Sequence, residues 1–224
     1  MRLNDCNSPR KVGMPAPCRR LGIISCAIAT GLLLAAGLSG CGSMKPVKYY
    51  TLTHPPTSTL GNSPSPMDAT ILVRPFQTSH LYREDRIVYG GEGEEVGLYQ
   101  YQRWVEPPVE LLQDALARGL RSTGHFKSVT TLRSDSSAEF CLLGHLYAFR
   151  EVGTGGVVAR LNFDVELTDL KLGKVIWRHT YNHDEPSSGK TVAGVAAAMD
   201  KNVQLSVQEI HDGVMQALAN YSRK

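Results

Sequence analysis

The sequence predicts an α+β domain, in which a twisted, mostly antiparallel sheet carries two helices packed on one face. Residues 161–168 alternate strictly between apolar and polar side chains, which is the pattern of a strand with one buried face. Apolar residues recur instead at helical spacing over residues 107–121 and again over residues 191–222. Elements with one apolar face are stable only when they bury that face against each other, so we expect a two-layer arrangement.

Residues 1–40 predict a signal peptide. Residues 1–20 are polar and basic and residues 21–38 carry no charge, which is the order of a secretory signal. The next junction is formed by Leu38, Ser39, Gly40 and Cys41. It resembles the lipobox of bacterial lipoproteins, in which the cysteine thiol receives a diacylglycerol and the chain is cut just before the cysteine. An uncleaved membrane helix is the alternative, because eighteen apolar residues are just long enough to span a bilayer.

Lipidation of Cys41 would anchor the mature chain to a membrane without any helix. Gly42 follows, whereas Asp at this position retains lipoproteins in the inner membrane of well-studied Gram-negative bacteria, so we expect the periplasmic face of the outer membrane. The chain after residue 40 has nineteen basic and twenty acidic groups, which gives nucleic-acid binding little support. Cys141 lies in an apolar run, and we expect no disulfide.

Residues 41–69 predict the lipidated N-terminus and a flexible tether. Residues 53–69 are rich in proline, serine and threonine, a composition that does not pack a core. A random coil of this length reaches roughly 20–25 Å, so the domain could meet a partner away from the membrane. The rest of the chain, residues 70–224, is then a single domain.

The strands of this domain are predicted from short apolar or alternating runs between turn signals. Before the alternating segment, these runs are Thr70–Phe76, Arg86–Tyr89, Val96–Trp104, Phe126–Leu132 and Phe140–Arg150. Phe140–Arg150 is apolar on both alternating faces, which predicts a central strand covered on both sides. This strand, the alternating segment and Val175–Tyr181 should form an antiparallel meander.

The two helices have clear boundaries. Pro107 and Pro108 suit the first turn of a helix that runs to Arg121, and a Ser-Thr-Gly sequence follows it. The second helix covers residues 191–222. Its apolar face consists of Val203, Val207, Ile210, Val214 and Leu218.

The polar residues show no arrangement typical of catalysis. Residues 187–191 resemble the end of a phosphate-binding loop, but Asp184 stands where its first glycine is required. His179 and His183 fall on a predicted strand and a predicted loop, and His145 is expected to be a hydrogen-bonded core residue. We therefore predict a protein that is not an enzyme, with no metal and no cofactor.

Seven aromatic residues cluster in the first half of the mature chain. They are Tyr49, Tyr50, Tyr82, Tyr89, Tyr99, Tyr101 and Trp104. Packing in the core and on the sheet is the ordinary explanation for such a set, and a platform for a partner or a lipid is the alternative.

The order of several short motifs points to a known family. Tyr49-Tyr50-Thr51-Leu52 comes shortly after Cys41, and Arg103-Trp104-Val105-Glu106-Pro107 directly precedes the first helix. Between them lie Ile71-Leu72-Val73, Leu81-Tyr82 and Arg86-Ile87-Val88. This order is similar to that of the ABC-type transport auxiliary lipoprotein family, which includes paraquat-inducible protein C. The sequence departs from the family pattern at Tyr89, where a basic residue is expected, and in the acidic glycine insertion at residues 90–95.

The resemblance implies a function. Members of the family accompany ABC transporters whose substrate-binding subunits carry mammalian-cell-entry (MCE) domains and which move lipids between the two membranes. The chain would then be a non-enzymatic, outer-membrane-anchored component whose partner is an MCE-domain protein, with phospholipid binding and self-association left open. The positions implied for partner contact or packing are Tyr49, Tyr50, Leu52, Trp104 and Pro107.

Two other functions stay open at this point. One is an envelope assembly or scaffold lipoprotein with a domain like the amino-terminal domain of TolB, which Thr70–Phe76 and residues 124–126 and 143–145 would also suit. The other is a periplasmic hydrolase that uses residues 187–191 or the pair His179 and His183.

Overall fold

The computed structural model of the chain describes residues 45–53, 67–93, 95–131, 138–153 and 156–221. The chain divides into the units Met1–Lys45 and Pro46–Lys224, and the described helices and strands all belong to the second. The predicted signal peptide and Cys41 lie outside the described residues. None of the helices in the described part has the length and apolar character needed to cross a membrane.

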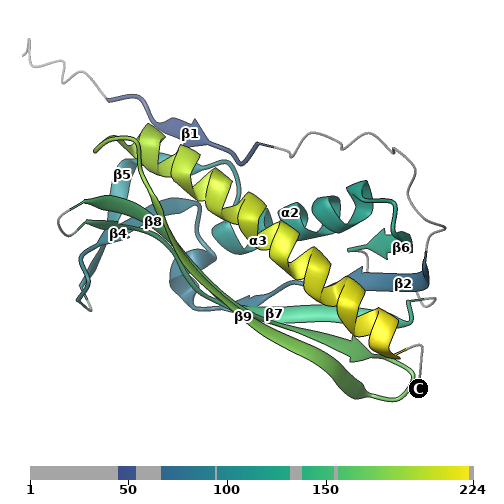
Figure 1. The fold of residues 1–224 in the computed structure, drawn as a ribbon. Helices are drawn as coiled ribbons and strands as arrows, with labels where there is room; N and C mark the ends of the chain where they lie inside the picture. Colours follow the sequence, from purple (N-terminus) through teal and green to yellow (C-terminus); the bar gives the residue numbers. More distant parts are fainter. Residues whose placement is uncertain (1–44, 54–66, 94, 132–137, 154–155, 222–224) are drawn as a thin grey trace, which may run out of the picture. The chain divides into compact units, whose positions relative to one another are not determined.

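The described strands form one nine-stranded sheet with β7 (Phe140–Gly153) at its centre (Figure 1). β8 (Val157–Asp169) pairs antiparallel along β7, and β9 (Lys174–Pro186) pairs antiparallel with β8. These three long strands form the predicted meander. They curve together beneath α3 (Val192–Tyr221) in Figure 1.

Shorter strands occupy the other edge of β7. Three of them pair in parallel with successive parts of it: β2 (Met67–Val73), β3 (Gln77–Thr78) and β4 (Arg86–Gly90). A 3-10 helix, η1 (His80–Tyr82), lies between β3 and β4. The sheet then continues outward through β6 (Phe126–Thr130) on β2, β5 (Val96–Trp104) on β4, and β1 (Lys48–Tyr50) on β5.

This topology corrects the predicted sheet, which is mixed rather than mostly antiparallel. Five of the eight strand pairings between described residues are parallel. Antiparallel neighbours can follow each other through a tight turn, and the sequence shows such turns. Parallel neighbours are joined by long crossovers, and alternation within a strand does not indicate its partner.

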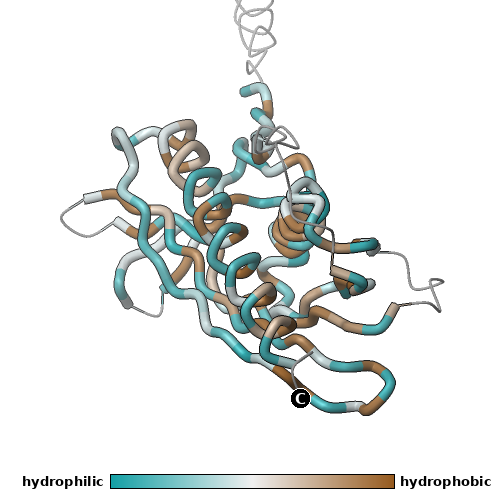
Figure 2. Tube along the Cα trace, turned by 45° about the vertical axis from the view of Figure 1, so that its right-hand side comes forward, coloured by the Kyte–Doolittle hydropathy of each residue, from teal (hydrophilic) through white to brown (hydrophobic). Residues whose placement is uncertain are grey.

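The two predicted helices are confirmed. α2 (Pro108–Ser122) has Pro107 at its N-cap and a proline in its first turn, where a missing N–H costs no helical hydrogen bond. Both helices lie on the same side of the sheet: α3 crosses β8 and β9, and α2 lies beside β6 and against α3 (Figure 1). Along α3, apolar and hydrophilic stretches alternate, as expected for a helix with one buried face (Figure 2).

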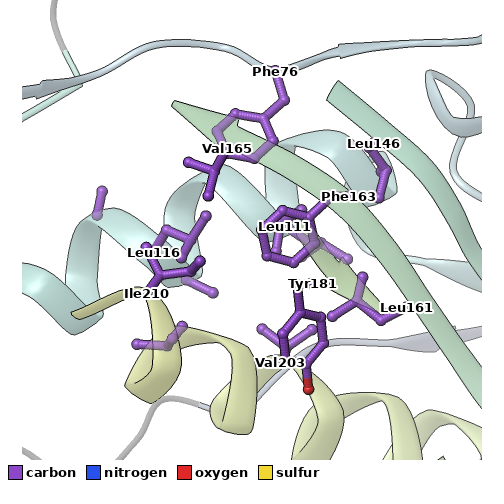
Figure 3. Close-up of a cluster of buried hydrophobic side chains, with 14 of the residues drawn as sticks. Phe76, Leu111, Leu116, Leu146, Leu161, Phe163, Val165, Tyr181, Val203 and Ile210 are labelled. Atoms are coloured by element: carbon purple, nitrogen blue, oxygen red, sulfur yellow. The ribbon is translucent and has the colours of Figure 1, made fainter. Parts of the chain in front are cut away.

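The core lies between the helices and β8. The side chains of Leu161, Phe163 and Val165 are completely buried and face the helix side chains of Leu111, Leu116, Val203 and Ile210 (Figure 3). Asn202 of α3 is also buried. Its amide donates to the carbonyls of Ala159 and His183, at 2.9 and 3.0 Å, and its side-chain oxygen accepts from Tyr181 at 2.7 Å. This polar group is satisfied and connects α3 to both strands below it.

The central strand β7 differs from the prediction in one respect. It has partners on both edges, but helices cover only one of its faces. On the other face Tyr147 is half exposed and its hydroxyl donates to Asp164 at 2.8 Å, and the ring of His145 stacks on Tyr147 with the centroids 4.5 Å apart. His145 is therefore partly buried on the outer face and is not the core residue that the apolar run predicted.

The folded unit begins at Pro46, well before the predicted boundary at residue 70. β1 pairs with β5, Leu52 is buried, and the backbone N–H of Thr53 donates to Asp200 of α3 at 2.8 Å. Residues 46–53, which the prediction placed in the lipidated N-terminus and tether, thus belong to the domain. Residues 54–66 lie outside the described residues and join two strands of one sheet.

Candidate functional site

Four of the five family-motif positions meet where β1 and the end of β5 pair, and the fifth lies just beyond, at the start of α2. We call this region the β1–β5 corner. Tyr50 stands opposite Trp104 in the strand register, and their rings meet edge to face with centroids 6.5 Å apart. The N–H of Val105 donates to the Tyr50 carbonyl at 2.8 Å, and the Tyr50 hydroxyl donates to Gln102 at 2.7 Å. Two motifs that lie fifty residues apart are thus one structural unit.

Trp104 and Leu52 are core residues of this corner, each only 2% exposed. The indole ring packs edge-on against Phe149 of β7, with the centroids 5.3 Å apart. Its Nε1–H is buried and has no hydrogen-bond partner among the residues that the structure describes. Trp104 therefore contributes apolar packing rather than a polar contact.

The chain is held on both sides of Trp104. Its N–H donates to the carbonyl of Asp85 at 2.7 Å, and the guanidinium of Arg103 binds the Asp85 carboxylate at 2.6 Å. The Pro107 carbonyl accepts the N–H groups of Glu110 and Leu111 at 2.9 and 3.0 Å, which starts α2. The motif residues thus set the junction between β5 and α2.

Tyr49 is the exception among the motif positions, because 60% of its surface is exposed. Successive side chains of a strand point to opposite faces. Tyr50 points to Trp104, so Tyr49 points away from the core, together with Val47 two residues earlier. Val47 is 41% and the neighbouring Val105 is 49% exposed. Among the described residues, these three apolar side chains are thus exposed on the outer side of the corner, where Arg103 stands opposite Tyr49 in the strand register.

The remaining tyrosines of the predicted aromatic set divide between packing and polar contacts. Tyr82 is buried in the core. Tyr89 and Tyr99 pack together with ring centroids 4.6 Å apart, and the Tyr99 hydroxyl donates to Glu151 at 2.9 Å. Burial and the Glu151 carboxylate raise the pKa of Tyr99 above its ordinary value, which favours the protonated phenol that donates this hydrogen bond.

The histidines considered for a metal site or catalysis have separate partners. Nε2 of His179 lies 2.6 Å from Glu209 of α3, and His183 is part of β9 rather than of a loop, 3.3 Å from Glu185. Ser187 bonds within its own turn. No group of three potential metal ligands occurs in the part of the chain that the structure describes.

Sequence reasoning missed two polar clusters that the fold assembles from distant segments. Glu185 binds the Lys201 ammonium at 2.5 Å, and this contact lowers the pKa of the carboxyl. His125 Nδ1 lies 3.0 Å from His211 Nε2, beside a cavity of about 110 Å³ between α2 and α3. The partners in each pair lie far apart in the sequence, so no local sequence pattern could have predicted these contacts.

The described residues form an α+β domain in which a mixed sheet packs against a long C-terminal helix, and its first strand pairs with the strand that leads through Trp104 into α2. A family model described as the ABC-type transport auxiliary lipoprotein component matches residues 50–211. The chain belongs to this family. The match confirms the resemblance seen in the motif order. It covers Tyr50, β5 and most of α3, and it begins after Lys48 and Tyr49 of β1.

Solved structures share the fold. Protein XCC0632 from Xanthomonas campestris is 19% identical with a TM-score of 0.68, and the alignment covers 80% of this chain and 99% of that one. An uncharacterized protein is 12% identical with a TM-score of 0.62, over 76% and 99% of the two chains. The PelC dodecamer from Paraburkholderia phytofirmans is less similar, at 16% identity and a TM-score of 0.40, over 64% and 92%. A comparison with curated protein sequences gives no significant match.

Proposed function

We propose that this protein is a non-enzymatic component of an MCE-type ABC transporter that moves lipid between the inner and outer membranes. It acts from the periplasmic face of the outer membrane, where lipid on Cys41 anchors it. The observation that carries the proposal is the family match over residues 50–211. The finer points, namely the MCE partner, the lipid cargo and the outer membrane, rest on what the family resemblance implies.

The charge distribution around the predicted cleavage site supports the anchor. Basic residues precede the uncharged segment 21–38, and Gly42 rather than Asp follows Cys41. Several acyl chains on one cysteine hold a domain on a bilayer stably, whereas a single chain holds it only marginally. The domain would therefore stay at the membrane without any spanning helix.

The test is a pull-down of the full-length, tagged protein from its own cells after mild crosslinking, with proteins and lipids identified by mass spectrometry. We expect an MCE-domain protein and phospholipid, both lost in the Cys41→Ser chain, which cannot be lipidated. Recovery of only secretion or peptidoglycan-associated proteins would contradict the transport role and favour the scaffold alternative with a TolB-like domain.

A further inference from the structure

The outer side of the β1–β5 corner carries three exposed apolar residues next to the segment that leads to Cys41. We propose that this apolar corner, made of Val47, Tyr49 and Val105, rests in the interface of the bilayer that holds the Cys41 lipid. The proposal deepens the proposed function, since it depends on lipidation of Cys41. The domain then has a defined orientation on the membrane, with the apolar corner as its contact surface.

The chain between the lipid and the corner limits how far the corner can lie from the bilayer. Only six residue steps separate Cys41 from Val47, and a fully extended chain covers about 20 Å in six steps. β1 has no slack of its own, because it pairs with β5 and its continuation is bonded to Asp200. The corner is therefore the part of the described domain that the chain connects most closely to Cys41.

The exposed side chains suit an interface. Tyr49 is 60%, Val105 49% and Val47 41% exposed. Tyrosine is enriched at the headgroup level of membranes, because its ring is apolar and its hydroxyl remains hydrated. Two valines beside it add apolar area that water otherwise covers, so seating the corner should be favourable.

The charges around the corner also fit. Lys45 is exposed two residues before Val47, and Lys48 is exposed on the opposite face of β1 from Tyr49. Lysine ammonium groups near a membrane surface are attracted to anionic headgroups. Arg103 is already paired with Asp85 at 2.6 Å. Glu106 is also exposed, and its negative charge offsets one of the two lysine charges. The balance favours a surface that contains phosphatidylglycerol.

If the apolar corner contacts the bilayer, the opposite end of the domain lies away from it. The corner is bonded to Asp200 in the first third of α3, and Tyr221 at the end of this helix donates to Asp169 at the β8–β9 turn. The twenty-one residue steps from Asp200 to Tyr221 correspond to about 32 Å of helix. In Figure 1, β1 and the β8–β9 turn lie toward opposite ends of α3. Lys171 in that turn is exposed and marks the far end.

The test measures the depth of two labels in the full chain. Lipidated protein with Glu106→Cys or Lys171→Cys is purified, labelled with a thiol-reactive fluorophore and reconstituted in vesicles of phosphatidylethanolamine and phosphatidylglycerol with nitroxide headgroups. The matched sites are both exposed and leave the apolar corner intact. Cys141 is fully buried and Cys41 is blocked by lipid, so each variant carries one label. We expect quenching several-fold stronger at position 106 than at position 171.

Two further variants make the result specific. Adding Val47→Ser and Tyr49→Ser to the Glu106→Cys chain should reduce the quenching at 106, whereas adding Leu172→Ser should not. Equally weak quenching at both sites, or stronger quenching at position 171, would overturn the proposed contact between the apolar corner and the bilayer. A purified chain without the lipid mass, which does not float with vesicles, would instead overturn the anchor itself and with it the proposed function.

Discussion

Trp104 shows how a single residue can mark a family without being a contact site. Its position before Pro107 was noticed as a motif, and the structure places it in the core against Phe149 and Tyr50. Sequence alone could not separate the two roles, because a buried and an exposed tryptophan look the same in a motif. For Tyr49 and Tyr50, the alternation of the strand decides which one is buried.

The indole N–H of Trp104 leads to a prediction about packing. Trp104→Ala should lower the free energy of unfolding by about 3–5 kcal/mol, because it leaves a large cavity between β5 and β7. Trp104→Phe should cost much less, since the Nε1–H that it removes has no partner among the described residues. Urea unfolding of the two variants checks this, and a Phe variant as unstable as the Ala variant would contradict the expected difference between them.

Glu185 provides a prediction about pH. The hydrogen bond from Lys201 lowers its pKa in the folded protein below the unfolded value of about 4.3. The pair therefore stabilises the fold fully above that value, and the stabilisation is lost as the pH falls through the lowered pKa. Between pH 7 and pH 3, the free energy of unfolding should decrease less steeply with falling pH for Glu185→Gln than for the wild type. Lys201→Met should flatten the profile in the same way, and an unchanged slope in both would contradict the pairing.

At the scale of elements, the sequence predicted the helices and the β7–β9 meander because their signals are local. The alternation in β8 and the helical spacing in α2 and α3 each lie within one segment. The parallel partners of β7 could not be predicted, since β2, β3 and β4 are short and reach it through crossovers. β1 was missed for a related reason: three residues beside a proline-rich stretch carry almost no pattern of their own.

The contact between α2 and α3 depends on one glycine. A Cβ added at Gly119 would lie well inside contact distance of the Cγ1 atom of Val207, and valine is stiff at χ1. Gly119→Ala should therefore destabilise the protein by about 1–3 kcal/mol, although alanine is the better helix former by about 1 kcal/mol. Thermal unfolding of Gly119→Ala, Val207→Ala and the double variant forms a complete cycle. The double variant should recover most of the loss, and strict additivity would rule out a steric cause.

At the scale of the whole molecule, the family and the α+β class were predictable, while the place of the domain boundary was not. The proline-rich composition of residues 53–69 indicated a tether. Residues 54–66 lie outside the described residues, and residues 67–69 belong to β2. Composition does not reveal, however, that the chain has already entered the sheet at β1 and returns to it at β2. The consequence is that only the residues between Cys41 and Pro46 separate the domain from the proposed lipid on Cys41.

This arrangement predicts that two equal insertions act differently. Fifteen glycine and serine residues placed after Gly42 should lift the domain from the bilayer and weaken the quenching of a label at position 106 in the lipidated chain. The same insertion within residues 54–66 lengthens a connection inside one domain and should leave the quenching unchanged. It roughly doubles that loop, so it should lower the free energy of unfolding by only about 0.6 kcal/mol. If both insertions reduced the quenching equally, residues 54–66 would be acting as a tether after all, and the pairing of β1 with β5 would not hold at the membrane.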